Sequence, residues 1–203
     1  MTTISESENL DLIFLMDRSG SMGGFEKDTI GGFNSFIQRE KAKELNTTVT
    51  TILFDDNYEV LYERKPICEV KELTENEYWV RGCTALLDAI GKTINSLDKK
   101  IDNKVLFVIM TDGLENASRE YSKEQITNMI QNHSWEFLYI GADIDSYREA
   151  GNIGIRKSRV AKYRKSRRGV EDLYTSVENA SYCLREDRNL DDEAWKESLR
   201  KYD

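Results

Sequence analysis

The stretch LIFLMDRSGSM, residues 12–22, decides the fold of this chain. It begins as an apolar run of the kind that forms a buried strand, and the run ends in a carboxylate, Asp17. Two hydroxyls follow at alternate positions, Ser19 and Ser21, with Gly20 between them. This pattern predicts a buried strand that delivers a carboxylate and two hydroxyls to one turn at its carboxyl end.

Other short runs predict the sheet in which this strand lies. Runs that are apolar on both faces are typical of parallel strands covered on both sides by helices. Residues 57–65 instead alternate in polarity and follow the preceding run closely, which predicts an antiparallel hairpin at the sheet edge. The predicted strands cover residues 10–16, 47–54, 57–65, 104–110, 135–141 and 158–163.

Segments with apolar residues at helical spacing alternate with these strands. They cover residues 25–45, 85–100 and 169–186, and Ser122 with Gln125 predicts a capping box for another helix that reaches about His133. Strands alternating with helices predict an α/β fold with a doubly wound, mostly parallel central sheet and one antiparallel edge strand.

The length of 203 residues predicts one domain, residues 1–190, followed by a C-terminal tail, residues 191–203. Asp191 or Asp192 is the expected cap of a short final helix in that tail, running through Leu199.

Composition restricts the function classes. Asp plus Glu outnumber Lys plus Arg by 37 to 29, and this net charge of -8 argues against general nucleic-acid binding. The three cysteines show no CxxC spacing, so a reducing compartment is expected. The first residues carry acids where a signal peptide would carry bases, and no apolar run is long enough for a membrane span. We therefore expect a cytoplasmic protein without membrane contact.

A second carboxylate, Asp112, ends the predicted strand in VIMTDG. Parallel strands end at the same sheet edge, so Asp17 and Asp112 would converge there and repel each other unless a divalent cation compensates. Ser19 and Ser21 are hard oxygen donors, which suit Mg²⁺ or Mn²⁺. Zinc is disfavoured, because the turn has no cysteine and the chain's single histidine lies elsewhere.

Thr84, in RGCTALLDAI, is a third candidate ligand at the start of a predicted helix, although threonine in that place is also a common helix N-cap.

The pieces DRSGSM, GCTALLDAI and MTDG, in this order, resemble the metal-ion-dependent adhesion site of the von Willebrand factor type A (vWA) domain. The resemblance covers roughly residues 8–186 and is strongest to small stand-alone bacterial and phage members. It implies a Rossmann-like vWA fold. It also implies that Ser19 and Ser21 ligate the metal directly, that Thr84 does so directly or through water, and that Asp17 and Asp112 act largely through bound waters.

The resemblance further implies a function in protein binding. With neutral direct ligands the cation keeps much of its charge toward solvent, and an Asp or Glu of a protein partner completes its coordination. The sequence therefore predicts a non-enzymatic, metal-dependent protein-interaction module with no catalytic residues.

The main alternative is a Mg²⁺-dependent, phosphatase-like hydrolase that uses the same strand-end carboxylates. Such an enzyme needs a second Asp two positions after the first, and that position here is Ser19. A serine hydrolase is disfavoured because SGSMG lacks the first glycine of GxSxG. Nucleotide binding is disfavoured because neither GxxxxGK[ST] nor GxGxxG occurs.

The segment RKSRVAKYRKSRR, residues 156–168, holds eight bases and no acid, while the rest of the chain has 21 bases against 37 acids. Three interpretations stay open. Its lysines discourage strand pairing at a sheet edge, or it contacts an acidic protein or a nucleic acid, or it meets an acidic surface of a second copy such as REDRNLDDE. The oligomeric state is open.

Its expected place at the far edge of the sheet predicts independence from the metal. Reversing the charges of Arg164, Lys165, Arg167 and Arg168 would then leave Mg²⁺ affinity nearly unchanged. Arg18, next to Asp17, is expected to be a solvated surface arginine.

Overall fold

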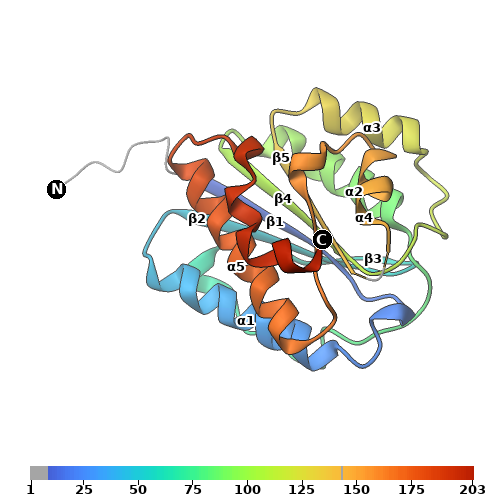
Figure 1. Cartoon of the computed structure of the whole chain (residues 1–203), viewed down its shortest axis with the longest axis horizontal. Coiled ribbons are helices and arrows are strands. Elements are labelled where there is room, and N and C mark those ends of the chain that lie inside the picture. The colour runs from blue at the N-terminus through green and yellow to red at the C-terminus, as the bar shows by residue number, and fades with distance from the viewer. Residues whose placement is uncertain (1–8, 143) are drawn as a thin grey trace.

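The computed structural model describes residues 9–142 and 144–203, and within them a six-stranded sheet lies between two layers of helices (Figure 1). The spatial order is β3-β2-β1-β4-β5-β6, and β3 pairs antiparallel while the other neighbours are parallel. This confirms the predicted α/β class with its antiparallel edge strand. The strands are β1 (Leu10–Asp17), β2 (Thr47–Phe54), β3 (Tyr58–Pro66), β4 (Lys104–Thr111), β5 (Glu136–Gly141) and β6 (Val160–Lys162).

Helices cover both faces of the sheet (Figure 1). On one face lie α1 (Glu26–Ala42) and α5 (Arg167–Arg185). On the other lie α2 (Leu86–Leu97), α3 (Lys123–Asn132) and α4 (Ser146–Gly151). The predicted capping box at the start of α3 is present. The sequence analysis missed α4, because six residues are too few to show helical periodicity.

The central strand β1 is apolar on both faces because each face packs against a different helical layer. Leu12 and Phe14 belong to the core cluster shared with α1 and α5, whereas Ile13 belongs to the cluster shared with α2 and α3. The ring of Phe14 meets the rings of Phe33 and Phe36 edge-on, at centroid distances of 5.7 and 5.4 Å. This two-sided burial fixes β1 in the middle of the sheet.

The order of the strands creates a switch point beside β1. The chain moves outward from β1 to β2 on one side, and later from β4 to β5 and β6 on the other. Doubly wound sheets bind ligands at the carboxyl ends of the strands at such a point. Asp17 is the last residue of β1 and Asp112 directly follows β4, so the topology brings both to this position.

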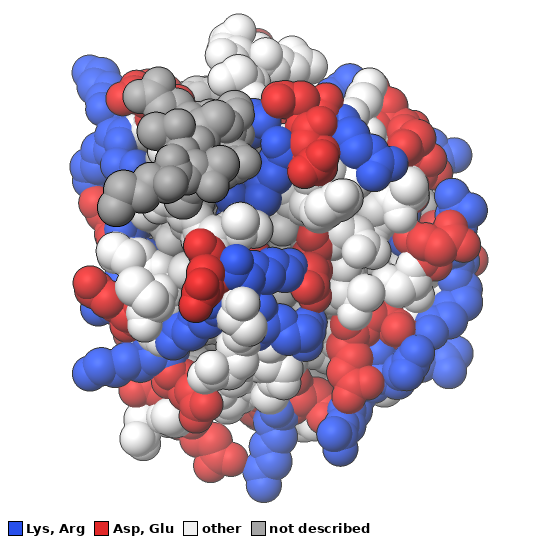
Figure 2. All heavy atoms as spheres, turned by 90° about the vertical axis from the view of Figure 1, so that its left-hand side faces the viewer, with Lys and Arg blue, Asp and Glu red and all other residues white. Residues whose placement is uncertain are grey.

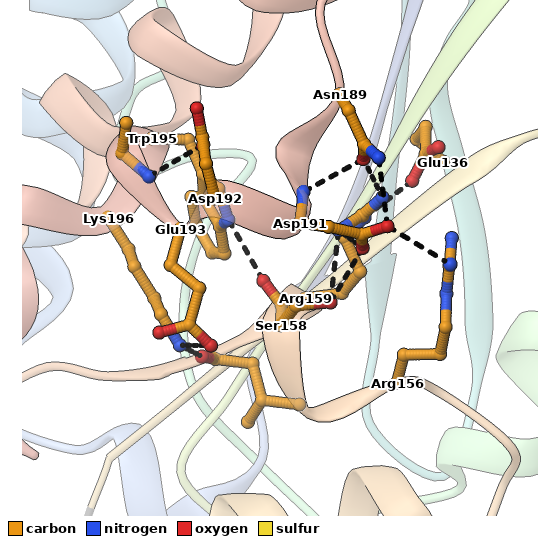
Figure 3. A network of polar contacts seen from close by, with 12 residues as sticks. Glu136, Arg156, Ser158, Arg159, Asn189, Asp191, Asp192, Glu193, Trp195 and Lys196 are labelled. Atoms are coloured by element: carbon orange, nitrogen blue, oxygen red, sulfur yellow. Dashed lines mark hydrogen bonds and ion pairs between the residues drawn. The ribbon is translucent and has the colours of Figure 1, made fainter.

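The segment after α5 packs against the outer edge of β6 (Figure 3). It forms 3-10 helices over Leu190–Asp192 and Ala194–Tyr202. The second contains Leu199, and its N-cap is Glu193, not the predicted Asp191 or Asp192, although the Asp192 carboxylate accepts a hydrogen bond from the Ala194 N–H at 3.0 Å. Trp195 is fully buried and donates its indole N–H to the Ser158 carbonyl at 3.0 Å.

The unpaired edge of β6 is protected by a lysine from this segment. The buried Lys196 donates from Nζ to the carbonyl oxygen of Val160, the first residue of β6, at 2.8 Å. A backbone acceptor that a further strand would need is therefore already bonded. The protection expected from lysines within the basic segment comes instead from a lysine outside it.

The basic segment also meets acidic residues of its own chain. Arg159, with a side chain 3% exposed, pairs with Glu136 and with Asp191, both at 2.6 Å, and Arg156 reaches Asp191 at 3.5 Å (Figure 3). Asp191 lies in the acidic stretch that the self-association hypothesis assigned to a second copy. Because Asp191 is already paired within its own chain, it is not available to bind the basic segment of a second copy, as that hypothesis would require.

Figure 2 shows the face on the side of the N-terminus, where acidic and basic side chains are interspersed. Outside the grey atoms, this face has no continuous basic area of the kind that follows a nucleic-acid backbone. Among the described residues, no helix is long and apolar enough to cross a bilayer.

The packing of Trp195 generates a stability prediction. We expect Trp195→Ala to lower the free energy of unfolding by about 3–5 kcal/mol, because it removes a fully buried indole and uncovers β6. Trp79→Ala is the control, since the Trp79 side chain is 43% exposed and its loss should cost much less. Urea denaturation of both variants measures the difference, and equal losses would contradict the packing role.

Candidate metal centre

Asp17 is held at the end of β1 by hydrogen bonds to both of its carboxylate oxygens. The backbone N–H of Ser19 donates to Oδ1 at 2.7 Å, and the hydroxyl of Thr111 donates to Oδ2 at 2.6 Å. Burial raises the pKa of Asp17 to about 6, the charge of Asp112 adds a smaller increase, and the two hydrogen bonds oppose it. Without a cation, ionisation of Asp17 therefore destabilises the folded state.

The hydroxyls of the turn lie between the two carboxylates. Ser19 and Ser21 are 3.0 Å apart at their Oγ atoms, and Ser21 donates to Oδ1 of Asp112 at 2.5 Å. Ser19 is buried while Ser21 is exposed, so the group opens to solvent on the side of Ser21. The turn thus places two hydroxyls beside the Asp112 side chain, which is fully buried.

Thr84 does not cap α2, because Ala85 occupies the N-cap position and the helix begins at Leu86. Its backbone is fixed by Asn116. The Thr84 N–H donates to Oδ1 of Asn116 at 2.9 Å, and the Asn116 N–H donates to the Thr84 carbonyl at 3.0 Å. The sequence analysis did not identify Asn116 as the residue that holds this loop.

Three hydroxyls surround one small space above Gly113. A β carbon built on this glycine would lie 2.8 Å from Thr84 Oγ1, 3.2 Å from Ser21 Oγ and 3.7 Å from Ser19 Oγ. The glycine therefore leaves free a position that all three hydroxyls face. Two carboxylates bond to the turn that carries these serines. Asp17 accepts a hydrogen bond from the Ser19 N–H, and Asp112 accepts one from the Ser21 hydroxyl.

This donor set fits a hard divalent cation. Neutral hydroxyl oxygens with nearby carboxylates and room for water are the ligands that Mg²⁺ and Mn²⁺ prefer. Over residues 9–142 and 144–203, no cluster of three or more His, Cys, Asp or Glu side chains is arranged to hold a metal. A metal in this place would therefore depend on the serine and threonine hydroxyls.

The prediction for Arg18 was wrong. Its side chain is only 1% exposed, and it pairs with Asp55 at 2.9 Å and with Glu59 at 2.8 Å. Arg81 reaches the same Asp55 oxygen at 2.8 Å, and Trp79 lies over both guanidinium groups. Arg18 is therefore a structural cation beneath the turn, and it joins the end of β2 to the loop before Thr84.

Backbone contacts join the turn and the Thr84 loop directly. The N–H of Gly20 donates to the carbonyl of Gly82 at 3.2 Å, and the buried Tyr78 hydroxyl donates to the Asp17 carbonyl at 2.6 Å. Gly82 has a φ of 64°, and a β carbon there would lie 1.8 Å from an oxygen of Asp56. Only glycine fits this position, so the loop geometry depends on it.

The basic segment is not independent of the site, which corrects the prediction. Lys165 places Nζ 2.9 Å from Oδ2 of Asp112 and 3.3 Å from the carbonyl oxygen of Ser21. The physical reason is the strand direction. Because β6 is parallel to β5, it ends at the same sheet edge as β1 and β4, and the following loop returns over that edge.

Most of the other basic side chains of residues 156–168 also contact groups of their own chain. Of the segment's eight bases, five make ion pairs within the described part of the chain, and Lys162 lies near the Tyr147 ring. A reversal of four charges here would break internal pairs as well as change an outer surface. The five are Arg156, Arg159, Lys165, Arg167 and Arg168.

Comparison with solved structures identifies the fold of this chain. No protein-family model matches the chain, and no curated protein sequence matches it significantly. Among solved structures, a von Willebrand factor type A structure from Catenulispora acidiphila aligns with 95% of this chain, at a TM-score of 0.55 and 15% identity. The chain has the vWA fold. It spans 43% of that structure.

Two further vWA-like matches were solved with a metal. Proximal thread matrix protein 1 from the mussel byssus, with a zinc-occupied MIDAS motif, aligns with 90% of this chain at a TM-score of 0.65 and 15% identity. Manganese-loaded TRAP protein from Plasmodium vivax aligns with 78%, at a TM-score of 0.57 and 18% identity. This chain covers 47% of the mussel protein and 70% of TRAP. Divalent metals therefore occur in proteins of this fold, zinc among them.

The space above Gly113 gives a prediction on metal binding. We expect Gly113→Ala to weaken Mg²⁺ or Mn²⁺ binding roughly 10–100-fold, because the methyl group enters the space that the three hydroxyls face. Gly31→Ala is the control, since a β carbon there meets nothing within 4 Å. Titration calorimetry with Mg²⁺, Mn²⁺ and Zn²⁺ measures both variants, and undiminished binding by Gly113→Ala would contradict this location.

The raised pKa of Asp17 gives a prediction on stability without metal. The folded-state pKa of about 6 exceeds the ordinary 3.8, so folding favours the protonated form and the free energy of unfolding falls as pH rises between these values. Asp17→Asn removes this pH-dependent loss of stability, because asparagine does not ionise. In chelator it should be more stable than the wild type above about pH 6, by on the order of 2–3 kcal/mol, and equal near about pH 4.

Asp172→Asn supplies a control of opposite sign. Burial alone would raise the pKa of Asp172, but hydrogen bonds from Lys201 and Tyr202 outweigh it and the pKa is lowered. The wild type therefore gains stability as pH rises from the lowered folded-state pKa to the ordinary value of 3.8 and keeps this gain at higher pH, so Asp172→Asn should be less stable than the wild type at neutral pH. Urea denaturation across pH compares the variants, and the same sign for both would refute the assignment.

Proposed function

We propose that this chain is a metal-dependent protein-interaction module, in which Mg²⁺ or Mn²⁺ binds above Gly113 and a partner's Asp or Glu completes the coordination. Ser19, Ser21 and Thr84 would ligate the cation, and Asp17 and Asp112 would hold it largely through water. The observation that carries the proposal is the convergence of three hydroxyls on one space.

The physical reason for a carboxylate partner is charge. Hydroxyl ligands are neutral, so a divalent cation held by them keeps a strong field toward solvent on the open side of the site. A carboxylate from another molecule can replace a water there. The exposed Ser21 lies on this open side.

The surroundings leave room for a partner. A hollow of about 760 Å³ opens beside the Thr84 loop, lined by Cys83, Asn116 and Arg119 among others. The exposed Leu114, 47% accessible, adds an apolar contact next to Gly113. A partner bound at the metal could therefore also contact this polar hollow and this apolar side chain.

The geometry favours binding over hydrolysis. Both oxygens of Asp17 accept hydrogen bonds, and Oδ1 of Asp112 accepts from the Ser21 hydroxyl. His133 lies at the end of α3, with Nε2 2.9 Å from Asp98. A general base would have to come from groups that are already bonded. We also propose a reducing, cytoplasmic location, since all three cysteines are free thiols.

The proposal predicts that a small carboxylate binds only to the metal-loaded protein. With Mn²⁺ bound, water-proton relaxation should be enhanced, and added acetate should reduce the enhancement because it displaces a coordinated water. The same titration with Gly113→Ala should show little enhancement, and Gly31→Ala should match the wild type.

Two outcomes would contradict this function. Bound Mn²⁺ whose relaxation signal ignores acetate and an acidic peptide would mean that the cation has no open position. Turnover of a phosphate monoester that is lost in Ser19→Ala would favour the hydrolase alternative. Capture of partners from extract, with Mg²⁺ and with chelator, then identifies the ligand protein.

A further inference from the structure

We propose that the ammonium of Lys165 is a tethered competitor of the metal. It neutralises Asp112 in the metal-free protein and leaves that carboxylate when a divalent cation binds. The inference rests on the proposed function, because it concerns the same site. It assigns to the basic segment a role that the vWA resemblance does not include.

The first support is the position of the ammonium. The Asp112 side chain is fully buried, Oδ1 accepts from Ser21, and Oδ2 lies 2.9 Å from Lys165 Nζ. The same ammonium donates to the Ser21 carbonyl at 3.3 Å. It therefore sits against the turn that carries the hydroxyl ligands and occupies a carboxylate oxygen that a metal-bound water would use.

The second support is charge. Asp17 ends β1, Asp112 directly follows the neighbouring parallel strand β4, and both side chains are buried. A positive charge beside these carboxylates is favourable in both the metal-free and the metal-bound protein. An ammonium and a divalent cation on the same carboxylate would repel each other at short range, so binding of the metal favours release of the lysine.

The third support is that the backbone of Lys165 is fixed while its side chain can move. Ser166 directly after it is the N-cap of α5 and accepts from the Gly169 N–H at 3.1 Å. Just before it, the Tyr163 N–H donates to the Gly141 carbonyl at 2.9 Å. Release can therefore occur by rotation of a four-carbon side chain that is already 16% exposed, without movement of the backbone.

An aromatic ring near the site can attract the released ammonium. While it pairs with Asp112, Lys165 Nζ already lies 5.3 Å from the centre of the Phe25 ring, and such a ring face attracts a cation. The side chain can thus stay at the rim. The ion pair with Asp112 then sets the metal concentration at which the site opens, since metal binding must overcome it.

The test replaces the ammonium and keeps the length of the side chain. We expect Lys165→Met to bind Mg²⁺ or Mn²⁺ about tenfold more tightly than the wild type, because the competitor is gone. In chelator the variant should melt at a lower temperature, because Asp112 loses its counter-ion. Lys104→Met is the matched control: Lys104 pairs with Asp187 at 2.6 Å, is 26% exposed, and begins β4 at the opposite edge of the sheet.

A second readout uses the wild-type protein, so it does not depend on the folding of a variant. Brief acetylation with acetic anhydride, followed by peptide mass spectrometry, measures the accessibility of each lysine. Saturating Mg²⁺ should increase the modification of Lys165 several-fold and leave that of Lys104 unchanged.

The outcomes separate this inference from the proposed function. Equal or weaker metal binding by Lys165→Met, or acetylation of Lys165 that ignores Mg²⁺, overturns the tethered competitor while the metal site stands. Failure of the wild type, Lys165→Met and Lys104→Met to bind any divalent cation overturns the proposed function itself.

Discussion

Two buried carboxylates at one edge of a parallel sheet are the constraint on which the rest of this structure depends. Asp17 and Asp112 end neighbouring strands, and the strand order leaves them no way to separate. Their charges must be balanced by hydrogen-bond donors, by a cation, or by protonation. The first two occur at this edge, where Thr111 and Ser21 donate and Lys165 supplies a positive charge, and the raised pKa of Asp17 makes the third easier than for an ordinary carboxyl.

The polar contacts around this pair of carboxylates fix the loops of the site and do not extend the hydrophobic core. The buried Arg18 and Asp55 form an ionic cluster under the turn with the partly exposed Arg81, and Asn116 bonds the Thr84 loop through two backbone groups. Such support would hold the hydroxyls of the proposed metal site in position before a cation binds, which would lower the reorganisation that binding requires. A site built from neutral ligands would need this preorganisation, because each ligand attracts a cation only weakly.

The sequence predicted the strands well because two-sided burial leaves a direct pattern, as in residues 10–16 and 104–110. It also placed Asp17, Ser19, Ser21, Thr84 and Asp112 at one edge, and the structure brings the loops that carry them together. It did not predict Lys165 at Asp112 or Arg18 beneath the turn. Those contacts join residues 53 and 37 positions apart, and local periodicity does not show where a loop returns or which acid a basic side chain meets.

The way in which the segment after α5 covers β6 has a consequence for synthesis on the ribosome. β6 pairs with β5 on one side only, and its other side is sealed by Trp195 and Lys196, which are translated some thirty residues later. Until they emerge, the nascent sheet has an open edge next to an unfilled apolar space, the state in which chains associate wrongly. A delay between the emergence of β6 and that of Trp195 would therefore prolong this exposure.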